Sequence, residues 1–102
     1  MADAELRRLW VAVRQDFDRA RALLPAPPAE AEGSVGRLAE WLDHNELELA
    51  LGELEALGED NTAPPAYWRE LASAAERMGL AEQAERLSRR AAEAGGQDRA
   101  KS

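Results

Sequence analysis

The sequence predicts an all-α protein, a small antiparallel bundle of four to five helices without a sheet. Ala, Leu, Glu and Arg fill most of its 102 residues. β-branched residues, which strands favour, are almost absent; they are Val11, Val13, Val35 and Thr62. Apolar residues recur at three- and four-residue spacing, which is the periodicity of a helix with one buried face. A chain of this length fits one domain.

The first predicted helix runs from Asp3 to Leu24. One apolar stripe follows it, made of Leu6, Leu9, Trp10, Val13, Phe17, Ala20 and Leu24. Prolines at positions 25, 27 and 28 then end the helix, because proline lacks a backbone donor and restricts the residue before it. We therefore predict a polar, extended linker over residues 25–33.

The next two helices are predicted to be short. Ser34 is a candidate N-cap for a second helix that carries Val35, Leu38, Trp41 and Leu42. Residues 43–46 interrupt this helix, and Asn45 tolerates left-handed geometry and can cap the next helix with Glu48. A third helix is predicted from Glu46 to Leu57, ended by Gly58.

Two further helices complete the prediction. The fourth begins at Thr62 or Ala63, has prolines 64 and 65 in its first turn, and ends at Gly79. The fifth runs from Leu80 to Ala94. Residues 1–96 form the single helical domain, and residues 97–102 are predicted to be a flexible tail. The side chains that we expect to be largely buried are Trp10, Phe17, Leu54, Trp68 and Leu71.

Composition excludes several classes of function. The net charge of −7 argues against nucleic-acid binding, which needs a basic face. The chain has no cysteine and one histidine, His44, so we expect no disulfide, no metal site and no cofactor. No nucleophile motif or glycine-rich phosphate loop is present, and we expect no enzyme activity. No apolar run approaches the length of a membrane span, and the acidic N-terminus is unlike a signal peptide. We expect a cytoplasmic protein.

The negative charge is concentrated in the middle of the chain. Residues 30–60 carry ten acids and one base, a net charge of −9, whereas the segments before and after each carry +1. On a helical wheel, one side of the third helix faces the core and carries Leu47, Ala50, Leu51, Leu54 and Leu57. Two acidic edges border a narrow apolar strip of Leu49, Gly52 and Ala56 on the opposite side. One edge is made of Glu46, Glu53 and Asp60, and the second is made of Glu48, Glu55 and Glu59.

This arrangement resembles a protein-binding patch with a charged rim. The predicted partner-binding residues are Asp43, His44, Glu46, Glu48, Leu49, Glu53, Glu55, Ala56, Glu59 and Asp60. The alternative is an acidic face that only keeps the domain in solution, with Leu49 as an isolated surface leucine.

One stretch resembles a known family. The segment Trp41-Leu42-Asp43-His44-Asn45-Glu46, followed by Leu49-Ala50-Leu51 and Leu54, is similar to the signature of small MafI-type immunity proteins of bacterial polymorphic toxin systems. Tyr67-Trp68-Arg69-Glu70-Leu71 and Glu76-Arg77-Met78 fit the same pattern. The resemblance implies a bacterial, cytoplasmic, all-α protein that binds and neutralises a toxin, often a nuclease. It carries no catalytic residues across. A basic nuclease cleft would complement the acidic face.

Two other interpretations stay open. A shift of 34 residues gives a partial internal match, which is the period of tetratricopeptide hairpins. A helical adaptor of that type would hold acidic peptides with Arg69, Arg77 or Arg86. The second interpretation is a homodimer packed through Leu49, in which the flanking carboxylates would repel one another. We expect a monomer or a weak homodimer.

Overall fold

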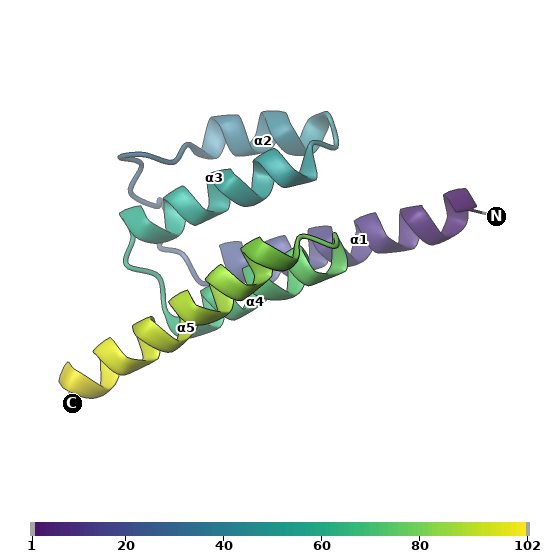
Figure 1. Cartoon of the computed structure of the whole chain (residues 1–102). Helices are drawn as coiled ribbons and strands as arrows, with labels where there is room; N and C mark the ends of the chain where they lie inside the picture. Colours follow the sequence, from purple (N-terminus) through teal and green to yellow (C-terminus); the bar gives the residue numbers. More distant parts are fainter. Residues whose placement is uncertain (1, 102) are drawn as a thin grey trace.

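The computed structural model of the chain describes the backbone of residues 2–101 and the side chains of residues 4–96. Within residues 2–101 it contains five α-helices and no strand, which confirms the predicted all-α class (Figure 1). The helices are α1 (Ala2–Arg21), α2 (Val35–Asp43), α3 (Leu47–Asp60), α4 (Pro65–Arg77) and α5 (Ala81–Lys101).

The helices are arranged in two layers. Helix α4 packs against both α1 and α5, while α2 and α3 form a hairpin above them (Figure 1). Contacts of α3 with α4 and α1 join the hairpin to the other layer. The molecule measures 50 × 26 × 19 Å. It is elongated because the first part of α1 and the last part of α5 extend beyond the other helices in opposite directions.

Several helix ends follow the sequence signals. The Ser34 side chain caps α2 by accepting a hydrogen bond from the Arg37 N–H, as predicted. Asn45 has φ +56° and turns the chain between α2 and α3. The predicted capping of α3 by Asn45 and Glu48 is wrong, however, because Glu46 occupies the N-cap of α3 and makes no side-chain capping bond. Gly79, with φ +74°, provides the left-handed turn between α4 and α5.

Gly58 does not end the third helix, because α3 continues to Asp60. The residue is needed for a close helix contact instead. A Cβ atom at this position would lie 2.6 Å from Tyr67 Cε1 and 2.8 Å from Trp68 Cη2. The missing side chain therefore lets α3 approach the aromatic residues at the start of α4.

Three other predicted boundaries need correction. Helix α4 begins at Pro65, with Pro64 as its N-cap, and not at Thr62 or Ala63. Helix α1 ends at Arg21 and not at Leu24, since residues 22–24 form a turn before the prolines. Helix α5 continues through Gly95 and Gly96 to Lys101, beyond the predicted end at Ala94. The side chains of the predicted tail, residues 97–102, lie outside the described residues, as does the backbone of Ser102.

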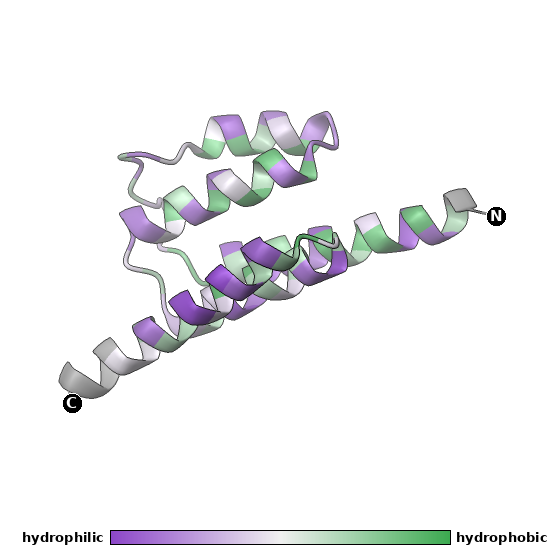
Figure 2. Ribbon diagram, viewed as in Figure 1, coloured by the Kyte–Doolittle hydropathy of each residue, from purple (hydrophilic) through white to green (hydrophobic). Residues whose placement is uncertain are grey.

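The core lies between the two layers and along α4, where hydrophobic residues of neighbouring helices face one another (Figure 2). Four of the five expected core residues are buried: Phe17, Leu54, Trp68 and Leu71. Trp10 is half-buried at the edge of this core. The periodicity missed Tyr67, which is fully buried and donates its hydroxyl hydrogen bond to the Leu54 carbonyl oxygen.

Candidate protein-binding surface on helix α3

The ten predicted partner-binding residues lie on α3, on the turn before it or, in the case of Asp43, at the end of α2. They do not form one open acidic surface. Four of the carboxylates are engaged by neighbouring elements of the same chain, and these are Glu53, Glu55, Glu59 and Asp60.

The side chain of Glu53 points from α3 towards α2 and is 10% exposed. It accepts hydrogen bonds from Arg37 Nε at 3.0 Å and from the Trp41 indole N–H at 3.2 Å. The backbone N–H of Ser34 donates a third bond at 3.0 Å. Burial raises the pKa of this carboxyl, but the hydrogen bonds from Arg37, Trp41 and Ser34 outweigh burial and hold the pKa below its ordinary value. Glu53 therefore ties the hairpin together.

Asp60 anchors the linker before α2. Its carboxylate accepts hydrogen bonds from the backbone N–H groups of Gly33 at 2.8 Å and of Glu32 and Ala31 at 3.0 Å. The bonds from Gly33 and Glu32 lower the pKa of Asp60, burial opposes them, and the bond from Ala31 lowers the pKa further. Two of the three acids of the first predicted edge, Glu53 and Asp60, thus bind other parts of the same chain.

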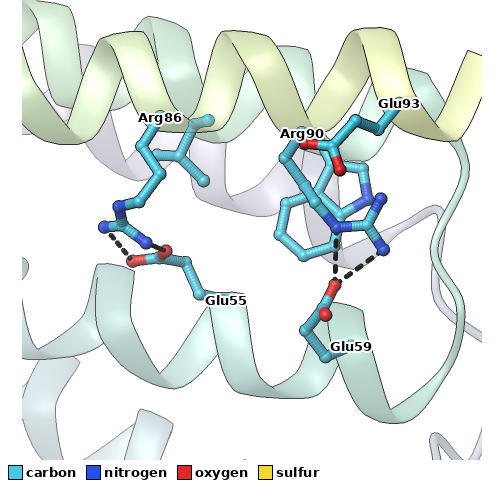
Figure 3. Close-up of a pocket in the computed structure, with 7 residues that line it drawn as sticks. Glu55, Glu59, Arg86, Arg90 and Glu93 are labelled. Atoms are coloured by element: carbon cyan, nitrogen blue, oxygen red, sulfur yellow. Dashed lines mark hydrogen bonds and ion pairs between the residues drawn. The ribbon is translucent and has the colours of Figure 1, made fainter.

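Glu55 and Glu59 face α5. Glu55 pairs with Arg86, and Glu59 pairs with Arg90 at 2.8 Å (Figure 3). These ion pairs cross a pocket of about 250 Å³ between α3 and α5, and Trp68 and Leu87 are among its lining residues. The Arg90 guanidinium lies 4.8 Å from the centroid of the Trp68 ring, within cation–π distance. The second predicted acidic edge is therefore largely neutralised.

The remaining predicted residues stay accessible. Leu49 is 48% exposed, and Glu46, Glu48 and Gly52 beside it are exposed as well. Ala56, at the other end of the predicted apolar strip, is half-buried. We use the term outer face of α3 for Glu46, Glu48, Leu49 and Gly52. Neither carboxylate of this face forms an ion pair with any side chain described between residues 4 and 96.

Asp43 and His44 lie at the end of α2, and both are exposed. His44 is the C-cap of α2, and its backbone N–H donates to the Glu40 carbonyl oxygen at 3.1 Å. This position agrees with the prediction that residues 43–46 interrupt the second helix. Asp43 has no ion-pair partner among the described side chains.

The ion pairs between α3 and α5 could have been predicted from the spacing of the charged residues, which a count of charges by segment does not consider. Glu55 and Glu59 are four residues apart, and so are Arg86 and Arg90. Residues at this spacing share one face of a helix. Two helices that run in the same direction can therefore form both ion pairs at once. The buried Asp16 was also missed, because an acid beside an apolar stripe carries no mark of burial in the sequence.

The described part of the chain offers no group of histidine and acidic side chains arranged to hold a metal ion. Among the helices described, none has the length and apolar character needed to cross a membrane. Comparison with protein-family models, with curated proteins and with solved structures found no match to this chain.

Proposed function

We propose that the chain is an immunity protein that binds a basic bacterial toxin domain, most simply a nuclease, through the outer face of α3. The observation that carries this proposal is the environment of Leu49. This side chain is 48% exposed and lies beside two exposed carboxylates, Glu46 and Glu48, that have no described ion-pair partner.

The contrast within one helix supports this assignment. Arg37, Arg86 and Arg90 pair with three other acids of α3, which are Glu53, Glu55 and Glu59, yet Glu46 and Glu48 receive no such arginine. An apolar centre with a charged border is the usual composition of a protein interface. A nuclease must bind phosphates and therefore presents basic side chains, which these carboxylates would complement. The proposal gives the chain no catalytic role.

The adaptor alternative has less support. It would hold an acidic peptide with Arg69, Arg77 or Arg86, but Arg77 pairs with Asp16 and Arg86 pairs with Glu55. A peptide could reach Arg69 directly, since Arg69 is exposed and has no ion-pair partner among the described side chains, but it would have to displace a carboxylate to bind either of the other two.

The test starts from the gene next to this one. If that gene encodes a secreted protein with a toxic C-terminal domain, the purified domain is titrated with this chain while nuclease activity is measured. Leu49→Arg places a charge in the centre of the proposed contact, and we expect at least about tenfold faster dissociation. Leu23→Arg is the matched control, since Leu23 is 41% exposed and lies outside α3.

Two results would contradict the proposal. One is a toxin domain that stays fully active at a large excess of this chain. The other is equal dissociation rates for wild type, Leu49→Arg and Leu23→Arg, which would move the contact away from α3.

A further inference from the structure

The first part of α1 extends beyond the helices that cover the rest of it (Figure 1). Helices α1 and α4 run antiparallel, since Arg19 pairs with Glu70 while Asp16, earlier in α1, pairs with Arg77 at the end of α4. Residues that precede Asp16 by more than about one turn therefore lie past the end of α4. We call residues 4–12 the α1 overhang.

The overhang continues the apolar stripe of α1 into solvent. Val13 and Phe17 are buried in the core. The side of α1 that carries Val13 and Phe17 also carries Leu6, Leu9 and Trp10. Leu9 and Trp10 lie four and three residues before Val13, and Leu6 lies four residues before Trp10. Leu6 is 43% exposed, whereas Leu9 and Trp10 are half-buried and pack against the edge of the core. Hydrophobic residues along this projecting helix are visible in Figure 2. The apolar stripe of α1 thus extends beyond the buried core, and Leu6 is its exposed end.

The overhang carries a net charge of +1, from Glu5, Arg7 and Arg8, and the end of α2 at the same end of the molecule carries the acids Glu40 and Asp43. Arg7 and Arg8 on the overhang are exposed, and so are Glu40 and Asp43 on α2. None of these four has an ion-pair partner among the described side chains.

Arg14 shows how close α1 comes to the α2–α3 turn. Its guanidinium donates to the Leu42 carbonyl oxygen and to Asn45 Oδ1, the latter at 3.4 Å. Arg7 lies two turns before Arg14 and therefore on the same side of α1. These contacts place the end of α2 beside the base of the overhang, on the side of the helix that carries Arg7.

We propose that two copies of the chain associate through their α1 overhangs, packed antiparallel about a two-fold axis. The apolar stripes of Leu6, Leu9 and Trp10 then cover one another. The two-fold axis brings equivalent sides of the two helices together. Arg7 of one copy consequently lies near the base of the other overhang, next to the partner subunit's Asp43. Symmetry forms this contact twice.

The surface formed by the overhang and the end of α2 carries charges of both signs, and this indicates that a second copy of the chain binds there. A basic partner would meet Arg7 and Arg8, and an acidic partner would meet Glu40 and Asp43. A second copy presents both signs in the complementary arrangement. At about 1.5 Å per residue the overhang is roughly 12 Å long. Two helical segments of this length bury less surface than the ~1,200–2,000 Å² of a stable complex. The dimer is therefore weak and depends on concentration.

The inference does not rest on the proposed function, and its variants leave Glu48 and Leu49 unchanged. The first experiment is sedimentation velocity of the full chain over about a hundredfold range of concentration. We expect a reversible monomer–dimer equilibrium that weakens with added salt, because salt screens exposed charges. Leu6→Glu should weaken dimerisation at least about tenfold. Leu23→Glu, at a comparably exposed leucine outside the overhang, should leave it unchanged.

A charge-reversal pair tests the two-fold arrangement itself. Arg7→Glu and Asp43→Arg should each weaken self-association, because each places like charges at both symmetric contacts. An equimolar mixture of the two variants should dimerise about as well as wild type, since the heterodimer restores both opposite-charge contacts. Circular dichroism confirms that each variant keeps its helix content.

A wild-type chain that remains monomeric throughout would overturn the proposal. A dimer unaffected by Leu6→Glu would also overturn it, as would a mixture that associates no better than the separate variants.

Discussion

The Arg77 guanidinium lies 2.8 Å from the carboxylate of Asp16, across the interface of α1 and α4, although the two residues are 61 positions apart. Asp16 is fully buried, and Arg19 contacts its other oxygen. A carboxylate in this position is tolerated only with partners, because an unpaired buried charge is strongly unfavourable. The pair of arginines therefore helps to fix the register of α1 along α4.

Removing one of these arginines should destabilise the protein. Arg77→Met keeps much of the aliphatic packing but leaves one carboxylate oxygen of Asp16 without its donor. We expect a loss of about 1–3 kcal/mol in the free energy of unfolding, the usual cost of an unsatisfied buried acceptor. Urea unfolding measures this loss. The control is Arg69→Met on the same helix, since Arg69 is exposed and forms no described ion pair; it should change stability by less than about 0.5 kcal/mol. Equal losses for both variants would contradict the role of Asp16.

Gly58 and Gly52 make a second matched pair within α3. A methyl group at Gly58 would lie within 3 Å of two rigid aromatic rings, whereas nothing lies within 4 Å of a Cβ at Gly52. Gly58→Ala should therefore cost about 1–3 kcal/mol through overpacking. Gly52→Ala should instead stabilise the protein by about 0.5–1 kcal/mol, because alanine favours the helical backbone. Thermal or urea unfolding distinguishes the two signs. Stabilisation by both changes would show that α3 and α4 can separate without cost.

Local signals in the sequence predicted most of the fold. The apolar spacing placed five helices, and the Ser34 cap, Asn45 and Gly79 marked turns that the structure contains. Gly58 was misread because glycine has two uses that look alike in a sequence, helix termination and close packing. The difference depends on Tyr67 and Trp68, which approach Gly58 only after α4 folds against α3.

The charge pattern was harder to interpret for the same reason. A helical wheel gives the direction of each carboxylate on α3, but it does not show which element occupies that direction. Glu53 meets Arg37 of α2, and Glu55 meets Arg86 of α5. For Leu49 the helical wheel gave the correct prediction, because no other element covers this side chain and it is exposed to solvent.

Asp60 should make the stability of the protein depend on pH. Its pKa in the folded state lies below its ordinary value, because the backbone N–H groups of Gly33, Glu32 and Ala31 donate to the ionised carboxylate. This stabilisation is fully present above the unfolded pKa and is lost as the pH falls through the folded pKa. Asp60→Asn should thus be less stable than wild type at neutral pH, and the difference should shrink below about pH 4.

Urea unfolding of both proteins at several pH values checks this prediction. Asp43→Asn is the control, since Asp43 is exposed and has no described ion-pair partner. It should differ little from wild type at every pH. A difference between Asp60→Asn and wild type that stays constant with pH would mean that the anchor of the linker does not depend on the charge.

The carboxylates of the outer face of α3 should act mainly on the rate at which the proposed toxin domain binds. Exposed charges steer the encounter of two proteins but contribute little once the contact has formed. The double variant Glu46→Lys with Glu48→Lys should therefore slow association and flatten its salt dependence, with a smaller change in the dissociation rate. Stopped-flow or surface-based kinetics at low and high salt would measure both rates.

The control carries the same change of charge on another helix. Glu82 and Glu85 of α5 are exposed and have no described ion-pair partner, so Glu82→Lys with Glu85→Lys alters the net charge equally. If both double variants slow association to the same extent, the effect belongs to the net charge of the molecule. If the α3 variant alone is slower, the basic partner approaches the side of the molecule on which Leu49 is exposed.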